Sequence, residues 1–148
     1  QYLSLNDYVS PEGIDYIGFF VATAGEKSRL VSNELKEKGE FYKGHIVNSI
    51  GLELAEATSE YIHKMMRQDV GIIDKNISLN EILNAQYQGN RYSFGYPACP
   101  DLSDQRKLFN LLKPERYGIT LTEEFMMYPE ATVSAIVFSQ PFCKYFNM

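Results

Sequence analysis

The residues whose types are best suited to bind a ligand lie between positions 91 and 101, where the chain reads Arg-Tyr-Ser-Phe-Gly-Tyr-Pro-Ala-Cys-Pro-Asp. Gly95 tolerates a positive φ, and each proline fixes its own φ and removes a backbone donor. Neither a helix nor a regular strand can therefore continue through this run. We expect a stiff, extended loop with unpaired backbone groups, an arginine at its mouth and aromatic rings along it.

A fixed cation beside exposed rings suits a small zwitterionic ligand that carries a flat ring. The planar guanidinium of Arg91 matches a carboxylate in a bidentate fashion. Gly95 allows a ligand to approach the backbone closely, and the ring of Tyr96 can stack on a base or face a cation, which contributes about 0.5–2 kcal/mol. A surface arginine, a turn glycine and a core tyrosine would explain the same residues without a ligand.

A metal site is not expected from the histidines or cysteines. Glu60 and His63 form a Glu-x-x-His pattern, which occurs in di-iron helical bundles, but those need a second copy and two further glutamates. The residue three positions before the other histidine, His45, is a tyrosine. His63 is therefore expected to be a partly exposed helix residue. Cys99 and Cys143 have no zinc-site spacing, and two cysteines indicate a reduced, cytoplasmic setting rather than a disulfide framework.

Composition excludes several classes of function. The chain has 148 residues, of which 45% are hydrophobic and 14% aromatic, enough for a real core. Its net charge of −5 argues against nucleic-acid binding, which needs clustered Lys and Arg. No apolar run is long enough to predict a membrane span. No Gly-x-Gly occurs, so the glycine-rich turn of Rossmann-type methyltransferases is missing.

The order of elements predicts an α+β fold. A buried strand over 16–22 precedes a long helical region over 26–68, with a break near Gly39. Six residues spaced three or four apart place an apolar stripe along the second half of that region: Ile46, Ile50, Leu54, Ala57, Tyr61 and Met65. Short helices are expected over 79–86, capped by Ser78, and up to about 112, and strands over 119–121, 124–128 and 132–139.

The run from Arg91 also resembles the Arg-x-x-x-Gly-Tyr-Pro-Ala-Cys-Pro signature of the activation domain of cobalamin-dependent methionine synthase. That domain binds S-adenosylmethionine. Further stretches resemble it in the same order, so the similarity spans nearly the whole chain: 15–25, 54–63, 87–91, 121–129 and 134–145. The Gly-Tyr-Pro-Ala-Cys-Pro core is the specific part of the match.

The resemblance implies a bent antiparallel sheet with long flanking helices, and it identifies residues 1–148 as a single domain, a partial activation domain of a larger multidomain enzyme. In this family the domain supplies the methyl group of S-adenosylmethionine for the reductive methylation of cob(II)alamin back to methylcobalamin. Cobalamin is bound mainly by another domain of the same enzyme, and flavodoxin or a similar reductant supplies the electron. The enzyme is a methyltransferase, but this chain alone would lack the main catalytic sites.

The resemblance also implies the ligand-binding residues. Arg91, Gly95, Tyr96 and Ala98 lie in the signature. Tyr145 and Phe146 match a pair of tyrosines that contact the ligand in the family, and the phenylalanine removes one hydroxyl contact. No catalytic residue is expected, because the nucleophile belongs to the cofactor and the leaving group to S-adenosylmethionine.

Glu56 occupies a position that is acidic in the family and near its ligand, where a carboxylate could offset the sulfonium charge. A solvated helix glutamate explains it at least as well. Two alternatives to the whole interpretation remain. The chain could be a stand-alone S-adenosylmethionine-binding module that serves another corrinoid protein, or a non-catalytic helical scaffold whose signature loop is only structural.

Overall fold

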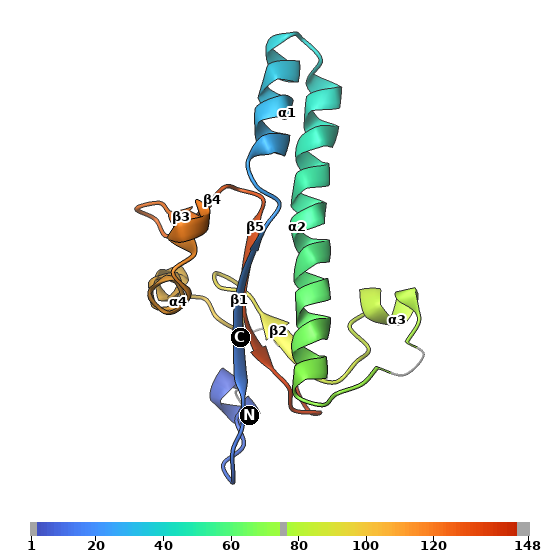
Figure 1. Cartoon of the computed structure of the whole chain (residues 1–148), viewed down its shortest axis with the longest axis vertical. Coiled ribbons are helices and arrows are strands. Elements are labelled where there is room, and N and C mark those ends of the chain that lie inside the picture. The colour runs from blue at the N-terminus through green and yellow to red at the C-terminus, as the bar shows by residue number, and fades with distance from the viewer. Residues whose placement is uncertain (1–2, 75–76, 145–148) are drawn as a thin grey trace. The chain divides into compact units, whose positions relative to one another are not determined.

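The computed structural model describes residues 3–74 and 77–144 and combines helices with a small antiparallel sheet (Figure 1). The α+β prediction is therefore confirmed. The chain divides into two compact units. The first unit comprises the residues up to Phe20, Ile62–Asp101 and the residues from Ala135 onward, and the second comprises Val21–Tyr61 and Leu102–Ser134. The expectation of a single domain remains a prediction.

The long helical region is two helices, as predicted. Helix α1 spans Lys27–Glu37 and α2 spans Phe41–Asp69. The break falls at Gly39, whose φ of +80° is a left-handed conformation that favours glycine. Within the second unit, α1 and the first part of α2 lie antiparallel (Figure 1). Glycine allows this close approach, because a Cβ on Gly44 would lie 2.8 Å from the backbone oxygen of Ser32.

The apolar stripe on α2 faces away from the core. Ile50, Leu54 and Tyr61 are 61%, 55% and 64% exposed, whereas Ala55 and Ser59 on another face of the helix are at most 1% exposed. Small residues on the buried face permit close packing, which is the physical reason that hydrophobicity alone does not identify the buried side. The stripe and its neighbours border an open apolar groove along α2 that includes Tyr42, Ile46 and Glu53.

The main sheet has three strands in the order β1-β5-β2, formed by Ile17–Thr23, Thr132–Phe138 and Asn90–Tyr92. Strand β2 pairs antiparallel with β5, with Arg91 opposite Val137. A second sheet joins β3, Thr120–Leu121, to β4, Met127–Tyr128. The predicted strand over 16–22 exists, but Tyr16 is 65% exposed and burial alternates along β1, so the strand is not fully buried.

Short helices complete the fold. The 3-10 helix η1 covers Leu5–Tyr8, and α3 covers Leu79–Leu83. Ser78 and Glu81 form the capping box expected at the start of α3. Helix α4 and two further 3-10 helices lie between β2 and β3: η2 Leu102–Asp104, α4 Gln105–Leu112 and η3 Pro114–Tyr117.

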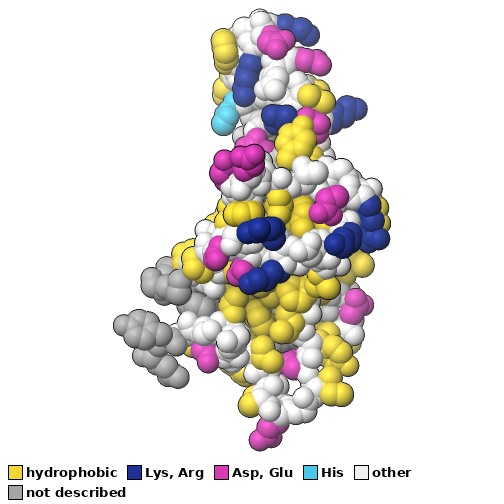
Figure 2. Space-filling model, turned by 90° about the vertical axis from the view of Figure 1, so that its left-hand side faces the viewer, with side chains coloured by type: hydrophobic (Ala, Val, Ile, Leu, Met, Phe, Trp, Pro, Cys, Tyr) yellow, Lys and Arg dark blue, Asp and Glu magenta, His cyan; other side chains and the backbone are white. Residues whose placement is uncertain are grey.

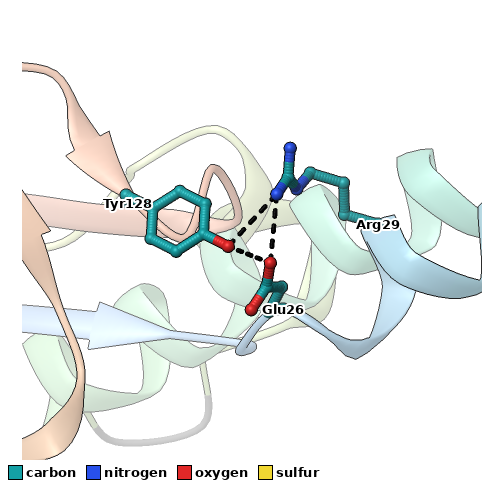
Figure 3. Close-up of polar contacts among 3 residues, drawn as sticks. All are labelled: Glu26, Arg29 and Tyr128. Atoms are coloured by element: carbon teal, nitrogen blue, oxygen red, sulfur yellow. Dashed lines mark hydrogen bonds and ion pairs between the residues drawn. The ribbon is translucent and has the colours of Figure 1, made fainter. Parts of the chain in front are cut away.

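A polar cluster in the second unit joins the start of α1 to β4 (Figure 3). The guanidinium of Arg29 donates to the hydroxyl of Tyr128 at 3.1 Å and to Glu26 at 3.0 Å, and the Tyr128 hydroxyl also donates to Glu26. The side chains of Arg29 and Glu26 are 40% and 35% exposed. Water competes for such groups, so the cluster fixes local geometry and contributes little to stability.

Candidate ligand-binding site

The signature segment folds as a short strand followed by a closed turn. Arg91 and Tyr92 belong to β2. Beyond them, the N–H of Gly95 donates to the carbonyl of Cys99 at 2.8 Å, and the N–H of Cys99 donates to the carbonyl of Tyr96 at 2.8 Å. The prediction of an extended loop with unpaired backbone groups is therefore wrong. The prediction that no strand occurs in this segment is also wrong, because its first two residues belong to β2.

Pro97 explains why the turn closes. Pro97 is the second residue of a four-residue turn that Tyr96 begins and Cys99 ends, the position at which a fixed φ is favoured and no donor is needed. Gly95 has a φ of +81°, which redirects the chain just before this turn. Local chemistry thus produces a compact, hydrogen-bonded projection where a rigid extended segment was expected.

The residues of the signature segment divide into a buried and an exposed set. Tyr92, Phe94 and Ala98 are at most 9% exposed, whereas Gly95 is exposed and Tyr96 is 57% exposed. The buried residues anchor the turn, and the exposed ones present a backbone and an aromatic ring to solvent. Because the Ala98 side chain lies in the core, only its backbone could contact a ligand.

Arg91 lies at the base of this turn. It is half-buried in β2, and its backbone N–H donates to the side-chain oxygen of Asn90 at 2.9 Å. Successive side chains on a strand point to opposite faces, so Arg91 lies on the face opposite buried Tyr92. Its guanidinium is close enough to His63 to lower the pKa of that imidazole.

The aromatic core beneath the turn also anchors the chain just before Tyr145. The cluster contains Tyr8, Tyr92, Ala98 and Phe138, and the rings of Tyr8 and Tyr92 stack with centroids 5.6 Å apart. Both tyrosine hydroxyls donate to the carbonyl of Lys144, at 2.8 and 2.9 Å. Burial raises the pKa of Tyr92, which keeps this donor protonated. Tyr145 and Phe146 themselves lie outside the described residues.

These two tyrosines are functional candidates that the sequence interpretation missed. Tyr92 lies inside the signature, and a signal for its burial existed in the alternation of Tyr92 with Arg91 along a strand. Tyr8 lies outside the signature, and its role depends on contacts with residues distant in the sequence. Glu56 lies on the exposed surface of α2 in the second unit, so its contribution to the site remains a prediction.

His63 is fully buried, with 0% of its surface exposed, which corrects the expectation of a partly exposed residue. Its ring packs edge-on against the ring of Tyr87, with the two ring centroids 5.4 Å apart. Neither nitrogen of the imidazole has a hydrogen-bond partner among the described residues. Burial and, to a smaller extent, the charges of Arg67 and Arg91 lower the pKa of His63 to about 3. The imidazole is therefore neutral at physiological pH.

We expect His63 to make the fold sensitive to mild acid. In the unfolded chain its pKa is near 6.5, and in the folded chain about 3, so the unfolded state binds more protons between these values. The contribution of His63 to the free energy of unfolding is fully present above pH 6.5. Below pH 6.5 this contribution falls by about 1.4 kcal/mol for each pH unit. Denaturant titrations at about pH 7 and about pH 5.5 test this expectation. The His63→Leu variant should lose this part of the pH dependence, and an unchanged slope would contradict the assignment.

Other kinds of site lack support in the part of the chain that the structure describes. Residues 3–74 and 77–144 contain no group of three or more His, Cys, Asp or Glu placed to hold a metal ion. Burial raises the pKa of the Cys143 thiol to about 11, so this cysteine is not an activated nucleophile. On the face shown in Figure 2, acidic side chains are scattered among the basic ones. No described helix is long and apolar enough to cross a membrane.

Comparison with known proteins gives a consistent match over the chain. The family model described as vitamin B12 dependent methionine synthase, activation domain, matches residues 1–148. Methionine synthases of Mycobacterium tuberculosis and Mycobacterium leprae are 36% and 34% identical over 142 residues. In each case the alignment covers 91% of this chain but only 12% of the relative.

A solved structure agrees with this match. The crystal structure of the MetH reactivation domain bound to AdoHcy superimposes with a TM-score of 0.87 at 34% sequence identity. The match covers 97% of this chain and 46% of the solved one, so the present chain spans less than half of the length of that chain.

Proposed function

This chain belongs to the activation-domain family of vitamin B12-dependent methionine synthases, and from that premise we propose that it binds S-adenosylmethionine for the reactivation of cobalamin. The observation that carries the proposal is the signature turn, which presents Gly95 and Tyr96 to solvent beside Arg91 on one aromatic core. The similar reactivation domain is bound to AdoHcy, which shares the adenosine and amino-acid parts of S-adenosylmethionine.

Each end of the ligand has a matching group in the first unit. The Arg91 guanidinium would bind the carboxylate of the amino-acid tail through paired hydrogen bonds. The exposed backbone at Gly95 would accommodate the nucleoside closely, and the Tyr96 ring would stack on the base or face the sulfonium. Tyr8 and Tyr92 hold the carbonyl of Lys144. The family resemblance implies that Tyr145 and Phe146, which follow in the sequence, contact the same ligand.

The role of the chain in the reaction is to position the ligand. S-adenosylmethionine supplies an electrophilic methyl group on its sulfonium, so no general acid or base is needed from these residues. Orientation of reactants in favourable cases contributes about 7–11 kcal/mol to lowering a barrier. We further propose that cobalamin is held mainly by another domain of the same enzyme and that a flavodoxin-like reductant supplies the electron. We also propose that the protein works in the reducing cytoplasm, in keeping with the absence of a disulfide at Cys99 and Cys143.

Ligand-induced thermal stabilisation tests the proposed function directly. S-adenosylmethionine at about 100 times its dissociation constant should stabilise the folded chain by about 2.7 kcal/mol, because it binds only the folded state. Differential scanning calorimetry with S-adenosylmethionine, S-adenosylhomocysteine and adenosine measures the resulting rise in the unfolding temperature. No shift with the first two ligands would contradict the proposal and favour the purely structural scaffold.

A further inference from the structure

A buried cation, an aromatic ring and an imidazole lie near the strand that carries Arg91. Arg67 is 1% exposed, and its guanidinium lies over the ring of Tyr87, 3.8 Å from the centroid. The same guanidinium is 2.5 Å from the carboxylate of Asp74. The ring of His63 contacts the ring of Tyr87 edge-on at 5.4 Å. We refer to Arg67, Tyr87, His63 and Asp74 as the buried stack.

The short segment between Tyr87 and Arg91 leaves little freedom. The side-chain amide of Gln88 donates to the carbonyl of Ser139 at 2.9 Å. Gly89 has a φ of +84°, and a Cβ there would lie 2.8 Å from the carbonyl oxygen of Phe138. Asn90 and Arg91 then pair with Phe138 and Val137 of β5. Tyr87 is therefore joined to Arg91 by three residues that lie directly against the end of β5.

We infer that Tyr87, held by the buried stack, is a positioning residue for Arg91 and thereby sets recognition of the amino-acid tail of the ligand. This inference rests on the proposed function and adds a residue to it. Arg67 fixes the ring face through a desolvated cation, His63 contacts the ring edge-on, and Asp74 fixes Arg67. The neutral imidazole adds no positive charge beside Arg67 and Arg91.

A pair of ligands distinguishes positioning of Arg91 from general damage to the fold. S-adenosylhomocysteine carries the amino-acid tail, whereas 5′-methylthioadenosine keeps the nucleoside and lacks the tail. Calorimetric titration of the full chain should show that Tyr87→Leu weakens S-adenosylhomocysteine binding about tenfold, because a small misplacement of a clamp is costly. Binding of 5′-methylthioadenosine should change by less than about twofold, since it does not use the clamp.

Conservative and matched variants complete the test. Tyr87→Phe keeps the ring face over Arg67 and should therefore bind S-adenosylhomocysteine as well as the unsubstituted chain does. Tyr42→Leu removes a 78% exposed tyrosine from α2 and should leave both affinities unchanged. If Tyr87→Leu fails to fold by circular dichroism, Arg67→Lys replaces it, because lysine keeps the charge and loses the planar stack. Equal losses for both ligands would overturn the inference.

A double-mutant cycle decides whether Tyr87 acts through Arg91. In an Arg91→Ala background, Tyr87→Leu should have no further effect on S-adenosylhomocysteine binding, whereas independent roles would give additive losses. Additive losses, or a loss with Arg91→Ala and none with Tyr87→Leu, overturn the positioning role and leave the proposed function intact. Binding of neither ligand by the unsubstituted chain overturns both.

Discussion

Replacement of Arg91 by alanine should weaken S-adenosylmethionine binding by at least about tenfold. Hydrogen bonds to a charged group contribute about 1.5–3 kcal/mol each, and a bidentate clamp on the ligand carboxylate would lose two of them. The half-buried position of Arg91 in β2 strengthens this expectation, because strand pairing with Val137 fixes its backbone before the ligand arrives. Isothermal titration of the full chain gives the dissociation constant.

Arg91→Lys separates geometry from charge in the same experiment. Lysine keeps the positive charge but cannot form the planar fork, so it should recover only part of the lost affinity. Arg116→Ala is the matched control, because Arg116 is an exposed arginine that donates to the carbonyl of Leu112 in the second unit. An affinity of Arg91→Ala equal to that of the unsubstituted chain would remove Arg91 from the site.

Much of the fold could be predicted from local sequence signals. Gly39 between two helical stretches predicted the break that its φ of +80° produces, and Ser78 with Glu81 predicted the capping box of α3. Both features depend on residues close together in the chain. The strand predicted over 124–128 was too long, because β4 contains only Met127–Tyr128. Phe125 just before it has a φ of +64°, a turn conformation that its residue type does not indicate.

Burial was harder to predict than element type, as His63 and the α2 stripe show. The apolar residues of the stripe indicated a buried face, yet Ile50 and Leu54 are mostly exposed and the buried face carries small and polar side chains. His63 is buried and contacts Tyr87, a residue distant in sequence. Hydrophobic periodicity reports the spacing of apolar residues and does not say which face meets the rest of the protein.

The candidate site was predicted in part. Glycine and proline chemistry predicted an irregular segment at Gly95 and Tyr96 but gave it an extended form, whereas the structure closes it into a hydrogen-bonded turn. The link from Tyr8 and Tyr92 to Lys144 joins three separate segments of the chain and could not be derived from any one of them. The ligand contacts of the described candidates stay predictions: Arg91, Gly95, Tyr96, Ala98 and Glu56.

Arg67→Met should destabilise the fold by about 3–5 kcal/mol. This is a large share of the total free energy of unfolding of a small domain, which is roughly 5–15 kcal/mol. The substitution keeps an unbranched apolar stem but removes the guanidinium that pairs with Asp74 and covers the ring of Tyr87. The Asp74 side chain is 8% exposed, so its carboxylate would be left buried without that cation. Urea unfolding monitored by circular dichroism measures the loss.

Two controls show that the penalty arises from the uncompensated charge and not from lost volume. The double variant Arg67→Met/Asp74→Leu removes both charges and should recover much of the stability, because apolar replacement of a whole buried pair is often close to neutral. Lys107→Met breaks an ion pair with Asp104 in which the lysine side chain is 83% exposed, and should cost less than about 1 kcal/mol. A loss in Arg67→Met no greater than in Lys107→Met would contradict this account, because it would mean that water reaches Asp74 and replaces the missing cation.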